Sequence, residues 1–337
     1  MERSIIGNVN AIDAPKIINR PWIRASLYSC AILAIFIFPL ISGPFALKLA
    51  NTAAVTAIAA MGLTVLTGTA GLLSLGQAAF LAIGAFTGAL LTKYVGTPLL
   101  INIAVGGLVA AALGTVVAAI TVRTVGIYLA VGTFALQHVV ELVLTDVEVK
   151  LTQAMGFQMN NPSLLGFEIR TERDWWVVLF INVLLVWALL SWLVKTHVGR
   201  NWILVRDQPA VAAAFGLSIT VSRMSAFALC AFVGGTVGVL HGYYVGTVQI
   251  TNYSLHLSIV YLTVIVLGGA GSIFGSIWAA ALITLLPHAL GWVLHTFGIE
   301  VLSGGAGIEN IVLGFILVIV LLRAPQKIMD LLKGIRR

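Results

Sequence analysis

Three polar side chains, Gln137, His138 and Glu141, lie close together in an otherwise apolar stretch of the sequence. If that stretch is a helix, His138 and Glu141 share one face at the i, i+3 spacing and can pair. Ionisable groups inside an apolar span are costly, and they usually face the interior of a helix bundle or a water-filled path. The residues therefore allow two interpretations, a functional path through the bundle or a structural pair near the outer membrane surface.

The composition excludes a soluble protein. The 337 residues are 60% hydrophobic and 9% charged, and the mean hydropathy is +1.05, whereas a soluble domain carries about 25% charged residues. Cys30 and Cys230 fall in apolar runs and indicate small buried hydrophobes, not a disulfide framework. The net charge of +7 does not predict nucleic-acid binding, because the basic residues lie between spans. The histidines show no metal-ligand spacing, so no metal site is expected.

A membrane-spanning helix needs about 20 mostly apolar residues. This criterion predicts an all-α polytopic membrane protein with about ten transmembrane helices, eight if re-entrant segments are present. The expected spans are 25–41, 46–66, 72–92, 98–121, 126–144, 175–194, 225–246, 254–270, 273–295 and 307–322. The third span and the pair around Gly268–Gly275 are the candidates for re-entrant segments.

One transmembrane domain, residues 25–322, is expected between a cytoplasmic segment, 1–24, and a basic cytoplasmic tail, 323–337. The first span is expected to be retained, because no small-residue cleavage site follows it. With the N-terminus inside, 14 of the 19 Lys and Arg residues fall on the cytoplasmic side. The positive-inside rule thus predicts both termini in the cytoplasm, a large outer loop at 145–174 and a large inner loop at 195–224.

Glycines recur at four-residue spacing in the apolar runs, which is typical of close helix packing in membranes. The glycines expected to pack helices are Gly88, Gly234, Gly238, Gly242, Gly246, Gly271 and Gly275. A sliding surface along a transport path is the alternative interpretation, and spacing alone favours packing.

Five ordered segments resemble a known family. The stretch GLTVLTGTAGLLSLGQAAFLAIGAFTGALL (62–91) is similar to the glycine-rich signature of LivM-type permeases of branched-chain amino acid ABC importers. The other four are RTVGIYLAVGTFAL (123–136), GRNWILVRDQPAVAAAFGLS (199–218), VLGGAGSIFGSIWAAALITLLP (266–287) and LGFILVIVLLRAPQKIMDLL (313–332).

The resemblance implies an ABC importer permease fold of the type II group in the bacterial inner membrane. It also implies a second, LivH-type permease, two ABC ATPase subunits that bind ATP and Mg²⁺, and a periplasmic or lipid-anchored substrate-binding protein. The cargo would be a branched-chain or other small amino acid. The residues expected to line the translocation path are Ser74, Gly76, Gln77, Phe80, Gly84, Gln137, His138 and Glu141.

The sequence departs from the family pattern at positions that bear on the cargo. Leu72 stands where Gln is frequent, and Gln77 where His is frequent. Gln137 and His138 replace a common Gly-Glu pair, and Glu141 replaces a common Arg. Relatives that carry urea, short amides or small carboxylates therefore remain an alternative.

The chain has no G-x-x-x-x-G-K-[ST] motif, so it is expected to bind no nucleotide cofactor and not to be an enzyme. If transport is driven by ATP, the energy of hydrolysis must reach this chain from another subunit, and the inner loop is the only cytoplasmic loop long enough to receive it. Asp207 and Pro209 predict a helix start there, and Gly216 predicts its end. The expected ATPase-coupling residues are Arg206, Asp207, Pro209, Ala212, Ala213, Phe215 and Gly216. The alternative to a contact with the ATPases is an interfacial helix that rests on the lipid headgroups.

Two other classes of protein remain possible. An autonomous secondary transporter or channel needs broken helices and usually carboxylates at the midplane, and only Glu141, toward one end of its span, lies near such a place. A structural membrane subunit would need no polar residues in its spans, so Gln77, Gln137 and His138 count against it.

Overall fold

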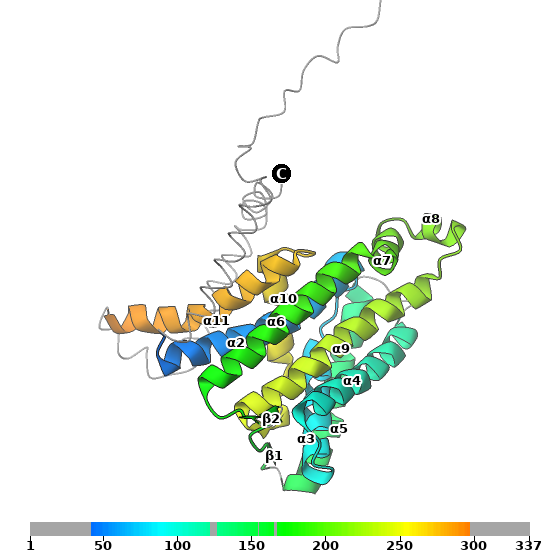
Figure 1. Ribbon diagram of the computed structural model, residues 1–337. Helices are drawn as coiled ribbons and strands as arrows, with labels where there is room; N and C mark the ends of the chain where they lie inside the picture. Colours follow the sequence, from blue (N-terminus) through cyan, green and yellow to red (C-terminus); the bar gives the residue numbers. More distant parts are fainter. Residues whose placement is uncertain (1–41, 122–126, 154, 165–166, 297–337) are drawn as a thin grey trace, which may run out of the picture.

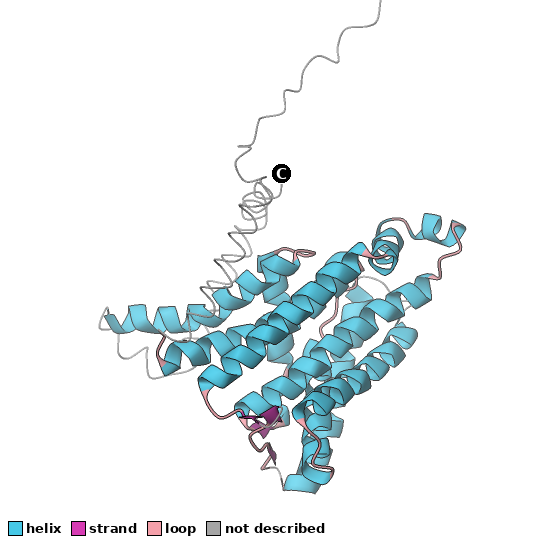
Figure 2. Cartoon of the chain, viewed as in Figure 1, coloured by secondary structure: helices cyan, strands magenta, loops and turns pink. Residues whose placement is uncertain are grey.

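The computed structural model describes residues 42–121, 127–153, 155–164 and 167–296. Almost all of this part is helical, and short strands lie at one end of the bundle (Figure 2). The helices are α2 (Pro44–Thr64), a π-helical turn η2 (Val65–Thr69), α3 (Gln77–Tyr94), α4 (Leu99–Thr121), α5 (Ile127–Thr152), α6 (Glu172–Lys195), α7 (His197–Asp207), α8 (Pro209–Ala214), α9 (Ile219–Val245), the 3-10 turn η3 (Ile250–Tyr253), α10 (Leu255–Gly268) and α11 (Ile273–Thr296).

Four two-residue strands form two small antiparallel pairs. β1 (Phe157–Gln158) pairs with β4 (Thr247–Val248), and β2 (Ser163–Leu164) pairs with β3 (Phe167–Glu168). Figure 1 shows β1 and β2 at one end of the bundle and α7 and α8 at the opposite end. The two long loops that the sequence predicts therefore lie at opposite ends.

Six helical segments in the described part of the chain are long and apolar enough to cross a membrane. They are 44–69, 99–120, 128–152, 172–195, 219–245 and 250–268. The expected spans at 72–92 and 273–295 correspond to α3 and α11, which are also apolar helices. The two remaining expected spans, 25–41 and 307–322, lie outside the described residues. The all-helical, multi-pass fold is confirmed.

The helices divide into a central and a peripheral group. α2 and α9 are mostly buried by their neighbours, whereas α4, α5 and α6 bury only a third or less of their most apolar windows. Large apolar side chains such as Leu108, Leu142 and Leu185 are exposed on the peripheral helices. Such an outward apolar surface suits lipid or another membrane subunit, because either can cover it without a cost in hydration.

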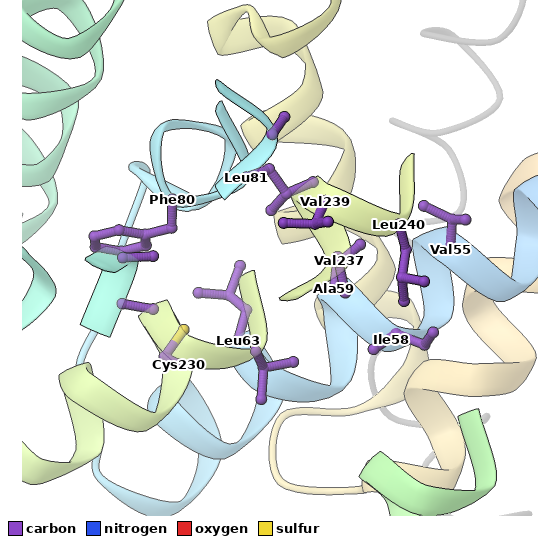
Figure 3. Packing of buried hydrophobic residues seen from close by; sticks show 14 of the residues in the cluster. Val55, Ile58, Ala59, Leu63, Phe80, Leu81, Cys230, Val237, Val239 and Leu240 are labelled. Carbon is purple, nitrogen blue, oxygen red and sulfur yellow. The ribbon is translucent and has the colours of Figure 1, made fainter. Parts of the chain in front are cut away.

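The core forms where α9 packs against α2, α3 and α4. Figure 3 shows Leu63 of α2, Phe80 of α3 and Val237 of α9 in this cluster, and all three are buried. The packing depends on glycine, because a methyl group at Gly84 would overlap the backbone of Gly235, and one at Gly238 would overlap the carbonyl of Leu81. The backbones of α3 and α9 thus touch directly, as small residues permit in membranes.

The other glycines of the expected set lie as follows. Gly234 and Gly242 face Phe80 and Val248, and Gly88 faces Val239. Gly275, in the first turn of α11, packs on Gly268, the last residue of α10, across the turn between the two helices. Gly271, in that same turn, has φ +98° and faces Gly68. Gly246 does not extend the stripe of α9: it has φ +80°, forms the C-cap, and has no atom near its missing side chain. The left-handed backbone explains this glycine, not helix packing.

Candidate functional site

The third crossing is not a continuous helix. After η2, Gly71 (φ +69°) begins an irregular segment, and α3 starts only at Gln77, near the middle of α2 and α9. The N-cap of α3 is Gly76, which has no side chain to accept from the first-turn amides. Its own amide lies 3.3 Å from Ser74 Oγ. The start of α3 is therefore buried in the bundle without a side-chain cap.

A second interrupted crossing leads to α10. The chain leaves α9 at Gly246, passes through β4 and η3, and begins α10 at Leu255. The N-cap Ser254 makes no side-chain cap hydrogen bond. The amide of Ala78, in the first turn of α3, donates to Ser258 Oγ in the first turn of α10 at 2.9 Å. The N-terminal ends of α3 and α10 thus meet.

The buried face of α5 covers this meeting point. The amide of Leu75 donates to Thr133 Oγ1 at 2.9 Å, and Gly76 lies against the Thr133 carbonyl. One turn further along α5, Gln137 Nε2 donates to the carbonyl of Tyr253 at 2.8 Å. Gln137 is fully buried, yet its Oε1 has no hydrogen-bond partner among the described residues. An orphaned acceptor of this kind is costly and calls for an explanation.

Gln77 lies in a different environment, although it is also fully buried. Its Nε2 donates to the Ala59 carbonyl of α2 at 3.2 Å, and the Cys230 thiol of α9 donates to its Oε1 at 3.2 Å. Both amide atoms are satisfied, so Gln77 joins three helices. Phe80 and Gly84 follow on the side of α3 that packs against α9. In the single chain these three residues belong to the packed core and line no exposed face.

His138 and Glu141 lie on the outer side of α5. Their side chains are 52% and 36% exposed, and His138 Nδ1 lies 3.6 Å from Glu141 Oε2. Phe134 packs edge-on against the His138 ring at 4.7 Å between centroids. The structure does not bring this pair to the buried point that Gln137 reaches. It places them on a surface that another molecule must cover if this part of α5 lies in the membrane.

The long loop expected at 195–224 forms a helical hairpin, α7 followed by α8. Gly216 follows α8 with φ +76°, as the sequence predicts for a helix stop, and Pro209 occupies the first turn. The predicted cap is wrong: Asp207 is the last residue of α7, and Gln208 is the N-cap of α8. Ala212 is buried, whereas Phe215 is 77% exposed and Ala213 is also exposed. The hairpin therefore presents a small apolar surface at one end of the bundle.

Two adjacent charges explain why Asp207 does not cap α8. Arg206 Nε donates to Asp207 Oδ1 at 2.7 Å, and this bond lowers the pKa of the exposed Asp207 carboxyl below its ordinary value. Arg206 also turns inward, where Nη1 donates to the Gly68 carbonyl at the end of η2. Its aliphatic part packs on Gly71, where a side chain would collide with it. Arg206 thus connects the hairpin to the irregular segment before α3.

Sequence reasoning singled out Gln137 and Arg206 but missed the carbonyls to which they donate, those of Tyr253 and Gly68. It also missed Thr133 and Ser258, whose hydroxyls accept from the amides of Leu75 and Ala78. Thr133 precedes Gln137 by four residues, so both lie on one face of α5, and this spacing was a usable signal. No comparable signal points to Tyr253 and Ser258, which lie more than 100 residues from Gln137 and Ala78.

The chain resembles known proteins along most of its length. Residues 45–321 match the model of a family described as the permease component of the branched-chain amino acid transport system. The high-affinity branched-chain amino acid transport system permease protein LivM of Salmonella typhimurium (strain LT2) is 29% identical over 306 residues, 82% of this chain and 72% of the relative. The protein of the same name from Escherichia coli (strain K12) is 28% identical over the same shares. No solved structure matches the chain.

Proposed function

Because the chain belongs to the family of permease components of branched-chain amino acid transport systems, we propose that it forms part of the membrane pathway of an ATP-driven importer for branched-chain amino acids. The observation that supports this most is the extent of the family match, from the first turn of α2 through α11. The six long apolar helices are what a multi-pass permease needs.

The partners in this proposal supply the P-loop that this sequence does not contain, and they cover the apolar surface that the peripheral helices expose. A second permease of the LivH type covers apolar surface on the peripheral helices, and lipid covers the rest. Two ABC ATPase subunits bind and hydrolyse ATP with Mg²⁺, and a periplasmic or lipid-anchored binding protein supplies the cargo. The chain itself binds no nucleic acid. It resides in the bacterial inner membrane with both termini in the cytoplasm, which places the α7–α8 hairpin inside.

The hairpin is the proposed contact with the ATPases. α8 with Ala213, Phe215 and Gly216 offers a shallow apolar surface, and Ala212 fixes it to the bundle. Asp207 and Pro209 shape the turn between the two helices. Arg206 offers no free guanidinium to the ATPases, because this group is engaged with Asp207 and Gly68. In the proposal, a displacement of the hairpin reaches η2 and the segment before α3 through Arg206.

The proposed translocation path runs along the two interrupted crossings. Ser74, Gly76 and the first turn of α3 lie on it, together with Gln137 on α5. His138 and Glu141 lie beside it, on the surface of α5 that a second permease covers. Gln77, Phe80 and Gly84 hold the back of α3 against α9, so their effect on transport is indirect.

Purification through a C-terminal tag, followed by reconstitution, tests the function. Gentle extraction from native membranes, with mass spectrometry of the accompanying chains, is expected to yield a second permease and P-loop ATPase subunits. The reconstituted complex, supplied with binding protein and internal ATP, is expected to accumulate leucine, isoleucine or valine. A chain that purifies alone and moves solute in liposomes without ATP would instead be a secondary transporter.

A further inference from the structure

Two helix N-termini meet inside this protein, and neither is capped by the side chain of its own N-cap residue. The first amides of any helix lack an intrahelical acceptor, and together they carry a partial positive charge. At the meeting of α3 and α10, Gly76 and Ser254 supply no side-chain cap, and Ser258 Oγ accepts from the single amide of Ala78. A pair of such ends in a membrane protein is a favourable place for an anionic group.

An independent observation points to a positively charged or donating group at the same place. Gln137 reaches this junction from α5, where its Nε2 donates to the Tyr253 carbonyl, one residue before the N-cap of α10. Its Oε1 is fully buried and unpartnered within the described chain. Thr133, one turn earlier on the same face, contacts Leu75 and Gly76 at the start of α3. The orphaned acceptor thus belongs to a side chain that bonds one residue before the N-cap of α10 and stands one turn from the residue that contacts the start of α3. A ligand with an N–H donor at the junction would satisfy it.

We propose that this junction binds the charged ends of an α-amino acid, with the carboxylate toward the first-turn amides of α3 and α10 and the ammonium group toward Gln137 Oε1. The inference rests on the proposed import of amino acids and assigns the recognition to particular groups. Donors and an acceptor at one junction match a zwitterion, whereas urea or a short amide carries no anionic group for the helix ends.

The start of α10 lies nearer the surface of this chain than the start of α3 does. The start of α3 is buried, but Ser254 and Leu255 at the start of α10 are half-buried, and Thr251 and His256 are exposed. The junction therefore reaches the surface of this chain beside α10. A second permease packed there would complete a path that runs past the site.

The test compares transport with ATP consumption in the reconstituted importer, with its binding protein saturated with leucine. Gln137→Leu keeps the size of the side chain and removes the acceptor. We expect uptake to fall roughly tenfold, as for the loss of a buried bond to a charged group, while the ATPase activity stimulated by the loaded binding protein persists. Leucine moved per ATP hydrolysed then falls by about the same factor. A purely structural defect would lower uptake and ATPase activity together.

Two further variants keep the result decisive. Gln137→Glu retains an acceptor oxygen, and in its protonated form the hydroxyl replaces Nε2 as the donor to the Tyr253 carbonyl. We expect it to restore most of the leucine moved per ATP. Asn182→Leu is the matched control, because among the described residues the Asn182 amide bonds to the Val178 carbonyl of its own helix alone, and it is expected to behave as the wild type. An unchanged ratio of transport to ATP consumption in Gln137→Leu, or equal loss of uptake and ATPase activity, overturns the inference. A wild-type complex that imports amides but not amino acids overturns the proposed cargo as well.

Discussion

Gln77 and Gln137 are both fully buried, but they lie in regions built in opposite ways. Around Gln77, α3 and α9 pack backbone to backbone beside α2, and both amide atoms have partners. Around Gln137, two helix ends meet without caps, and an acceptor is unpaired. The difference indicates a core that holds the bundle together and, in our proposal, a neighbouring junction that forgoes stability for ligand recognition.

The largest expected effect comes from crowding the packed region. In Gly84→Val the new side chain meets the backbone of Gly235, which has no room to yield. We expect a loss of about 3 kcal/mol or more in the free energy of unfolding, seen as a collapse in the yield of monodisperse protein. Gly43→Ala is the control, because, apart from its chain neighbours, no described residue lies within 4 Å of a Cβ placed at Gly43. Normal yield and thermal stability in Gly84→Val would contradict the backbone contact between α3 and α9.

Arg206 tests whether the hairpin and the irregular segment are connected. Arg206→Ala removes the bond to the Gly68 carbonyl and the packing on Gly71. We expect the complex to assemble, but leucine uptake per ATP hydrolysed to fall about tenfold, as for a lost bond to a charged group. Arg200→Ala, on the same helix and exposed, should leave this ratio unchanged. Equal behaviour of the two variants would remove Arg206 from the coupling route.

A smaller effect separates the two glutamines directly. Gln77→Leu loses a bond to Ala59 and leaves the Cys230 thiol without its acceptor, so we expect a loss of about 1–2 kcal/mol in the free energy of unfolding. Gln137→Leu loses one bond but also removes the unpaired acceptor, so the loss should stay below about 1 kcal/mol. Thermal unfolding of the two purified variants in one detergent measures the difference. Identical midpoints of thermal unfolding for the two variants would contradict the proposed difference between core and junction.

The smallest expected effect concerns Asp207. Its pKa is lowered in the folded protein by Arg206, so the pair stabilises the fold above the unfolded pKa of about 4. That contribution is lost as the pH falls through the lower, folded pKa. Because the carboxyl is exposed, Asp207→Asn should shift the melting temperature little at pH 7, and the shift should vanish in strong acid. A large shift at pH 7 would mean that Asp207 has another partner.

Hydropathy predicts the crossings well because lipid demands long apolar segments whatever their backbone conformation. Hydropathy does not reveal the interruption before α3, because it reports side chains and not backbone conformation. The residues from Gly71 to Gly76 are mostly apolar or small, as in a spanning helix, and only their backbone departs from one. The helix start at Asp207 was misjudged because a neighbouring arginine competes for the carboxylate. The Gln137 site needs Tyr253 and Ser258, whose proximity arises from tertiary packing, which no local pattern encodes.

The pairing of β1 with β4 has a mechanical consequence. Phe157 and Gln158 bond to Val248 and Thr247, and the amide of Met159 donates to the Gly246 carbonyl. Glu148 adds a second attachment by accepting from the amide of Ile250. These bonds join the end of α5 and the long loop after it to the segment that leads into α10, so these segments move together. A molecule that binds the loop and displaces it therefore also displaces the residues from which α10 begins.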